Sequence, residues 1–158
     1  MKKYGVNALR FSVALVGLII LLLCIFWLPQ MARVSAEQNP EHAYLRYPLL
    51  YGLYITTIPF YLGIFHTFKL LNLISKNTAF TVDACKSLGR IQIYTIIEIA
   101  LYFIGMVFLN LNNVLHPGIF ILGLVIIFAC FIISVFSSVL KALLTKVVEI
   151  KNENDYTI

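Results

Sequence analysis

Two long apolar segments separated by a short basic stretch constrain the fold of this chain more than any other feature. The apolar segments cover residues 49–73 and 91–109, and the sequence SKNTAFTVDACKSLGR lies between them at 75–90. That stretch holds one acid, Asp83, and three basic residues, Lys76, Lys86 and Arg90. A helix needs about 20 apolar residues to cross a bilayer. The pattern therefore predicts two membrane-spanning helices joined by a structured basic connector.

The composition indicates that lipid is the solvent for most of the chain. Of the 158 residues, 61% are hydrophobic and 12% are charged, and the mean hydropathy is +0.91. A soluble domain usually contains about 25% charged residues. The net charge of +5 would suit a protein that binds nucleic acid, but the basic residues lie at the ends of apolar runs rather than on one soluble face. We therefore expect a lipid bilayer as the surroundings and no direct binding of nucleic acid.

Four apolar runs predict an all-α, single-domain bundle of four transmembrane helices within residues 1–158. The predicted spans cover residues 11–28, 47–73, 91–109 and 119–140, with the connector at 75–90 and a tail at 141–158. The first run is not that of a signal peptide, because it ends in Ile-Phe-Trp-Leu-Pro without a small-residue cleavage site. As a helix it would measure about 27 Å, near the thickness of the hydrocarbon core.

The distribution of basic residues predicts the orientation of the bundle. Placing both termini and the connector on one side gathers ten of the twelve basic residues there and leaves Arg33 and Arg46 opposite. The ten are Lys2, Lys3, Arg10, Lys69, Lys76, Lys86, Arg90, Lys141, Lys146 and Lys151. Short loops rich in Lys and Arg stay in the cytoplasm. We therefore expect a multi-pass protein of the plasma membrane with both termini in the cytoplasm.

Two prolines predict local features of the first two spans. Pro29 is expected to mark the exit of the first span, so that residues 30–46 form a polar loop with at most a short amphipathic piece. Pro59 is expected to kink the second span, because it removes a backbone donor. Thr56 and Thr57 could then satisfy the carbonyl of Ile55 that Pro59 leaves free.

The third and fourth helices are expected to extend beyond the membrane. Asn77, Thr78 or Thr81 can cap the third helix, and Asp83 in the first turn favours its dipole. This helix is expected to begin near Thr81, project from the membrane, and end near residue 109. The fourth is expected to continue to about residue 150, followed by a polar, frayed tail.

Glu98 is the clearly ionisable residue inside a predicted span, about 12 Å past Arg90 along the helix. A carboxylate there costs several kcal/mol unless it is paired, neutralised or hydrated, so it should face the bundle interior. Candidate neighbours are Gln92, Thr95 and Tyr102 on its own helix and His66, Thr56, Tyr54 and Ser134 on others. Three interpretations stay open: Glu98 fixes helix packing, it senses a proton or ligand together with His66 and Pro59, or it lines an ion or substrate path.

No catalytic, cofactor-binding or metal site is expected. The three histidines lie on two sides and at different depths, and the three cysteines are not closely spaced. The serines of the fourth span have no acid, base or oxyanion group beside them. The sequence also contains no phosphate loop and no nucleophile elbow. We therefore expect a protein that is not an enzyme and carries no cofactor.

Several motifs of this chain occur together in one known family. They are the Tyr47-Pro48 pair, the Ile58-Pro59-Phe60-Tyr61 motif, the connector residues 76–81, and the segments 122–129 and 150–158. In these features the chain resembles DUF2975, a bacterial family of small four-span membrane proteins of unknown function that includes the YoaS-like proteins. Members are often encoded beside a very small helix-turn-helix regulator of the Xre/Cro type. The resemblance therefore implies, by association, a membrane partner of a DNA-binding protein.

The leading hypothesis is a non-enzymatic membrane protein that senses an envelope or membrane condition, or sequesters a small cytoplasmic helix-turn-helix regulator. In this hypothesis Phe80, Lys86, Arg90 and the tail present or hide a docking face, and Glu98 or Pro59 couples the bundle to it. A cytoplasmic connector that is basic and amphipathic would suit such a role.

Two alternatives stay open. A small transporter, channel or immunity-type protein, which could form a homo-oligomer, predicts a water path reaching Glu98; flux into proteoliposomes that is unchanged by Glu98→Gln would count against it. A structural subunit of a larger membrane complex would pair Glu98 with a cation of its partner, and purification as a lone species would weaken that hypothesis.

Overall fold

The computed structural model describes residues 3–38, 40–76 and 78–156, and in these residues helices are joined by short connections. The elements are α1 (Lys3–Leu22), the π-helix η1 (Leu23–Trp27), α2 (Leu28–Gln38), the 3-10 helix η2 (Pro40–Leu45), α3 (Arg46–Ser75), α4 (Val82–Leu111) and α5 (Pro117–Tyr156). Within the described residues, four helical stretches are long and apolar enough to cross a membrane: Tyr4–Val34, Pro40–Ser75, Val82–Leu111 and Pro117–Lys151. The predicted all-α fold with four spanning helices is confirmed.

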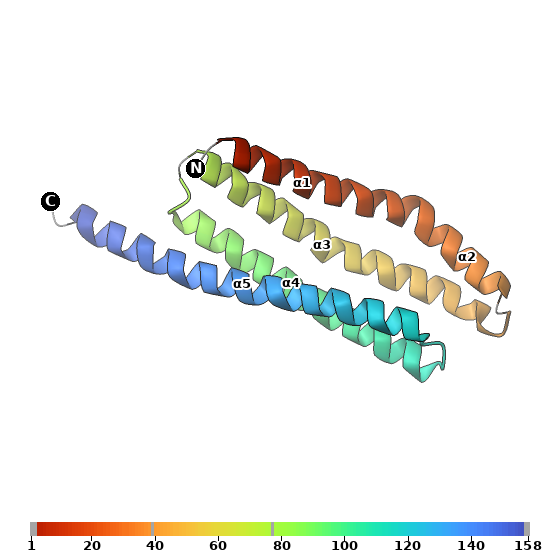
Figure 1. The fold of residues 1–158 in the computed structure, drawn as a ribbon. Coiled ribbons are helices and arrows are strands. Elements are labelled where there is room, and N and C mark those ends of the chain that lie inside the picture. The colour runs from red at the N-terminus through yellow and green to blue at the C-terminus, as the bar shows by residue number, and fades with distance from the viewer. Residues whose placement is uncertain (1–2, 39, 77, 157–158) are drawn as a thin grey trace.

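The four spanning helices lie side by side in chain order, with α1 and α2 as one rod, and each span is antiparallel to the span before it (Figure 1). The most extensive packing is between α4 and α5, followed by α3 with α4, and then by α1 and α2 with α3. The beginning of α1, the connection between α3 and α4, and the end of α5 lie at the same end of the molecule (Figure 1). We call this the connector end, because residues 76–81 lie there.

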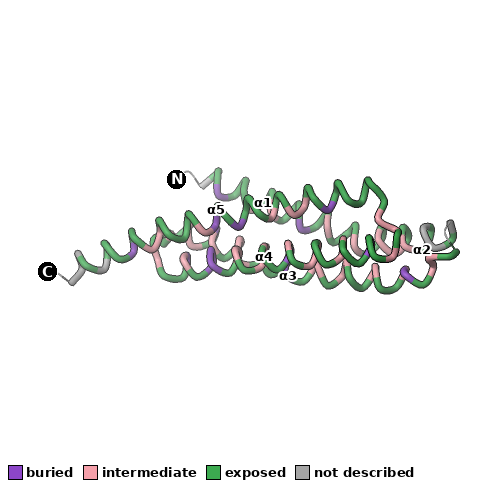
Figure 2. Tube along the Cα trace, turned by 90° about the horizontal axis from the view of Figure 1, so that it is seen from below, coloured by how far each residue is buried: buried purple, intermediate pink, exposed green. Residues whose placement is uncertain are grey.

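Most large apolar residues are exposed rather than buried between the helices, and Figure 2 shows exposed residues along every helix. The buried apolar residues are few, namely Val6, Leu45, Leu71, Ala84, Leu88, Leu109 and Val148. Four polar residues are also buried: Ser87, Glu98, Ser134 and Ser137. In water such an exposed apolar surface would be unstable, whereas lipid covers it without cost. Ser134 and Ser137 lie on α5, where small hydroxyl residues allow neighbouring helices to approach closely.

The first helix continues past Pro29, contrary to the expectation that a loop starts there. The chain stays helical to Gln38, and the π-helix Leu23–Trp27 directly precedes the proline. In this π-turn the Leu28 N–H donates to the carbonyl of Leu23, five residues earlier. A π-turn widens the helix locally, which lets it accommodate the missing donor and bulk of a proline. Among the described residues, the short η2 lies between this long helix and α3.

In the second span, the hydrogen bonds of the two threonines before Pro59 differ from their prediction. The helix α3 runs through this residue from Arg46 to Ser75, and Pro59 is buried. The Thr56 hydroxyl donates to the Leu53 carbonyl at 2.8 Å, and the Thr57 hydroxyl to the Tyr54 carbonyl at 2.7 Å. The threonines therefore do not donate to the Ile55 carbonyl. A threonine hydroxyl on a helix donates to a carbonyl three or four residues before it in the sequence.

The connector places the start of the third span where the sequence predicted it. Helix α4 begins at Val82, Thr81 occupies the N-cap position with extended backbone, and Asp83 lies in the first turn. The Thr81 hydroxyl does not cap the helix but donates to the carbonyl of Thr78 at 3.0 Å. Thr78 in turn closes the end of α3, since its N–H and hydroxyl both donate to the Leu73 carbonyl. The third candidate cap, Asn77, lies outside the described residues.

Helix α5 is longer than predicted. It continues to Tyr156, so the stretch expected to be a frayed tail is helical as far as that residue. The Thr145 hydroxyl lies 3.7 Å from the Cys85 sulfur, and α4 begins three residues before Cys85. Because the two helices are antiparallel, residues beyond about Val148 extend past the start of α4, as Figure 1 shows. This extension is the part of the described chain that stands furthest out from the bundle.

Candidate functional site

Glu98 lies in the interior of the bundle, as its charge predicted. Its residue is 6% exposed, and the carboxyl oxygen Oε2 is enclosed without a hydrogen-bond partner. The backbone of Phe60 on α3 lies opposite and interacts with the carboxyl group. Phe60 directly follows Pro59, so the buried acid of α4 faces the point where α3 lacks a backbone donor. This position makes Glu98 sensitive to any change in the packing of α3 on α4.

Polar groups from all four spanning helices surround this level of the bundle. Tyr102, one turn further along α4, interacts electrostatically with Glu98 and with the Thr56 side chain of α3. Cys130 on α5 and Cys24 in η1 also lie near Tyr102. We call these residues, Glu98, Tyr102, Thr56, Cys130 and Cys24, the central polar cluster. Of the predicted neighbours of Glu98, the structure thus brings Tyr102 and Thr56 to this level.

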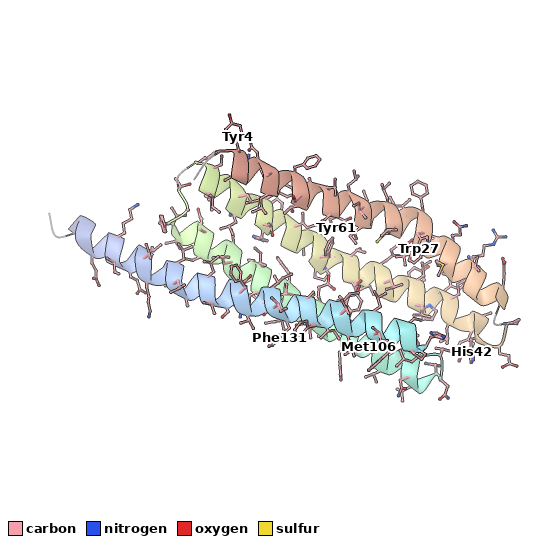
Figure 3. All side chains as sticks on the ribbon, in the orientation of Figure 1. Tyr4, Trp27, His42, Tyr61, Met106 and Phe131 are labelled. Carbon is pink, nitrogen blue, oxygen red and sulfur yellow. The ribbon has the colours of Figure 1, made fainter. Side chains whose placement is uncertain are left out.

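Two tyrosines join the first helix to α3 on either side of the central polar cluster. The Tyr61 hydroxyl donates to the Gly17 carbonyl at 2.8 Å, and the Tyr54 hydroxyl donates to the Cys24 carbonyl at 3.1 Å. Figure 3 shows Tyr61 on α3, beside α1. Gly17 is buried here, and a Cβ on it would come within 3.2 Å of Ile64. Because lipid offers no competing donor, such side-chain bonds to helix carbonyls hold neighbouring spans together.

Glycines also permit close packing between α4 and α5. A Cβ on Gly123 would lie 2.8 Å from the sulfur of Met106, which Figure 3 places on α4. Nearer the connector end, a Cβ on Gly89 would lie 3.1 Å from the Lys141 nitrogen. The α4–α5 pair is therefore the tightest part of the bundle at both ends of the seam.

His66 lies away from Glu98, nearer the connector end. Its ring centroid is 5.7 Å from that of Tyr94 on α4 and 5.5 Å from that of Phe65. Lys69 and Arg90 are close enough to act electrostatically on the imidazole. The structure therefore separates the two residues that the sequence proposed as joint sensors: Glu98 belongs to the central polar cluster, and His66 belongs to a basic group on the α3–α4 seam.

The proposed docking residues fall into two places. Phe80 in the connector and Lys86 near the start of α4 are exposed at the connector end. Arg90 is also exposed, one helical turn further along α4 and close to His66. Sequence reasoning did not single out Arg10, whose guanidinium donates to the Asn72 side chain at 2.6 Å and joins α1 to α3 at this end. The sequence could have indicated this hydrogen bond, because Arg10 lies near the start of the first span and Asn72 near the end of the second. These two ends lie level in an antiparallel pair.

The central polar cluster combines a carboxyl group, a phenol, a hydroxyl and two free thiols within the spanning helices. A search of the described residues finds no group of three or more His, Cys, Asp and Glu side chains that could hold a metal ion. The cysteines at 24, 85 and 130 are free thiols and half-buried. These polar groups therefore offer hydrogen bonding and packing between the spanning helices.

These features define a small polytopic α-helical membrane protein with one buried acid and a basic end. A family model described as "Protein of unknown function (DUF2975)" matches residues 30–158. The chain is 40% identical over 160 residues to a protein described as "Uncharacterized membrane protein YoaS" from Bacillus subtilis (strain 168), and the match covers 100% of both chains. The chain therefore belongs to the DUF2975 family, which confirms the resemblance seen in its motifs. No solved structure matches it.

Proposed function

We propose that this chain is a non-enzymatic sensor in the bacterial plasma membrane, and that its cytoplasmic end binds a small helix-turn-helix regulator. The proposal takes the partner class from the family association and the docking site from the structure. The observation that carries it is the extension of α5 beyond the start of α4. A helix that leaves its bundle with one apolar side uncovered is suited to lie in a groove of a partner protein.

The end of α5, from residue 143 into the extension, has the residue pattern of a docking helix. Leu143, Val147 and Ile150 are exposed and recur at the spacing i, i+4 and i+7, which places them on one side of α5. Val148 points the other way and is buried. Phe80 and Lys86 are exposed at the same end. We call Leu143, Val147 and Ile150 the docking stripe, and propose that a regulator binds it beside Phe80 and Lys86.

The proposed function requires the connector end to face the cytoplasm. We expect Lys86→Cys, in a chain whose native cysteines are replaced by serine, to react with a membrane-impermeant maleimide only after the cells are permeabilised. Glu41→Cys, at the opposite end, should react in intact cells. The physical reason is the excess of Lys and Arg at the connector end. Labelling of the cysteine at position 86 in intact cells would contradict this orientation.

A pull-down tests the docking stripe directly. Full-length protein extracted from its own membranes in a mild detergent is expected to recover a small helix-turn-helix protein. Ile150→Ser should lower the recovery about tenfold, because loss of a central apolar contact costs about 1–2 kcal/mol of binding free energy.

The matched control is Leu9→Ser on α1, which makes a similar change at an exposed residue near the same end but away from α5, Phe80 and Lys86. It should leave recovery unchanged. If no helix-turn-helix protein is recovered under several growth conditions, or if both variants recover it equally, the docking proposal is wrong.

A further inference from the structure

We propose that the α3–α4 seam at the connector end binds the phosphate of an anionic phospholipid headgroup through His66, Lys69 and Arg90. This site is separate from the docking stripe on α5 and from the central polar cluster. It would exist whether or not a regulator binds the cytoplasmic end.

The helix register brings these three residues together. The ring pair of His66 on α3 and Tyr94 on α4 fixes which residues of the two helices lie level. Lys69 is one turn from His66 toward the connector, and Arg90 is one turn from Tyr94 in the same direction, since the helices are antiparallel. Residues three or four apart share a helix face. Lys69 and Arg90 therefore lie level with each other on the connector side of the ring pair.

The positive charge of this group is not balanced within the described chain. Lys69 and Arg90 are both exposed, and both act electrostatically on His66. Neither forms a salt bridge with any residue that the structure describes; Arg33 pairs with Glu37 at the opposite end of the molecule. Two cations beside an imidazole, without a neighbouring acid, form a site for an anion.

The imidazole has unused hydrogen-bonding capacity. Its Nδ1 atom is enclosed and has no partner. Its Nε2 atom is neither among the enclosed atoms nor bonded to any described residue. In the tautomer that carries its proton on Nε2, the ring can donate a hydrogen bond to a phosphate oxygen at the surface of the seam. Arg90 can give two parallel hydrogen bonds to the same phosphate, and Lys69 supplies a point charge.

The depth of the site favours a lipid over a free phosphate ion. Lys69 lies about 9 Å from the end of α3, and Arg90 about 12 Å from the start of α4. These depths place the group near the level of the headgroups, where basic pockets between spanning helices bind anionic lipids. Phe65, which packs on His66, is 63% exposed on the side away from the connector end. It can cover the start of an acyl chain whose phosphate occupies the basic group.

Native mass spectrometry of the full chain in detergent tests the proposal, with added phosphatidylglycerol or phosphatidylcholine as probes. Wild-type protein is expected to retain phosphatidylglycerol in preference to phosphatidylcholine. Lys69→Gln and Arg90→Gln should each weaken phosphatidylglycerol binding about fivefold, and the double variant about 25-fold, since each cation contributes about 1 kcal/mol to anionic lipid binding. His66→Phe keeps an aromatic ring against Tyr94 and should also weaken binding.

Two controls separate a specific site from general charge attraction. Lys146→Gln removes one exposed cation of the same end on α5 and should leave binding unchanged, whereas Arg90→Lys keeps the charge but not the two parallel hydrogen bonds and should weaken binding less than Arg90→Gln does. Inorganic phosphate should not displace the lipid. The proposal is wrong if Lys146→Gln weakens binding as much as Arg90→Gln, if the two lipids bind equally, or if inorganic phosphate competes fully. Thermal unfolding of each variant shows that the changes arise in folded protein.

Discussion

Ala84→Leu is expected to lower the stability of the bundle by about 1–3 kcal/mol, the usual cost of inserting bulk into a closely packed interface. Ala84 is 0% exposed, and its neighbours Ser87 and Leu88 are buried with it at the start of α4. The same part of α4 packs on α5, where Thr145 touches Cys85. A leucine at position 84 would therefore push α5 away from α4 or force side chains out of their preferred rotamers.

The matched control makes the same substitution on the same helix. Ala100 is exposed, so a leucine there meets lipid instead of a neighbouring helix. Ala100→Leu is expected to leave stability within about 0.5 kcal/mol of wild type. Thermal unfolding in detergent gives the melting temperature of both variants. In a chain of this size, each kcal/mol lost from the free energy of unfolding should lower the melting temperature by about 2–4 °C. Equal melting temperatures for the two variants would contradict the packing of α4 on α5.

The sequence predicted the spanning helices because their pattern depends on composition alone. Each apolar run must form its own backbone hydrogen bonds in lipid, and only a helix does so within one segment. The start of α4 was also predictable, since Thr81 and Asp83 are typical of a helix N-terminus. What composition could not show was the continuation past Pro29, because that depends on the π-turn at Leu23–Trp27 and on the Tyr54 bond to the Cys24 carbonyl.

The candidate site was predictable only in part for a similar reason. Burial of Glu98 followed from the cost of a charge in lipid, and its neighbour Tyr102 followed from helical spacing. Partners on other helices depend on register, which an apolar surface facing lipid does not specify. The sequence therefore placed His66 beside Glu98, whereas the register puts Phe60 opposite Glu98 and His66 opposite Tyr94.

Glu98→Lys is expected to be the most damaging single substitution in the central polar cluster. The lysine ammonium group is charged and can only donate hydrogen bonds. The substitution places it at a buried position, since Glu98 is 6% exposed. A buried lysine in a span costs about 2.5 kcal/mol or more, because no acid of the described chain lies near to pair with it. We expect little folded protein to be recovered from membranes, measured as the monodisperse fraction after detergent extraction.

Two controls show whether the loss comes from burial in the bundle or from the membrane itself. Ile97→Lys places the same side chain at the same depth, but residue 97 is 41% exposed to lipid, so the lysine can extend along the helix toward the headgroups. It should cost less than Glu98→Lys. Glu98→Gln keeps the shape and one acceptor oxygen and replaces the other with a neutral NH2 donor, and should stay within about 1 kcal/mol of wild type, a typical value for one hydrogen bond.

The three variants together decide what Glu98 does in the bundle. If Glu98→Lys is as well folded as Ile97→Lys, the carboxyl group does not face the interior, and the position opposite Phe60 is wrong. If Glu98→Gln is folded but the protein no longer responds to its membrane condition, titration of the carboxyl is part of sensing. If Glu98→Gln retains both folding and response, Glu98 is a packing residue, and its polar contact with α3 beside Pro59 accounts for its burial in the span.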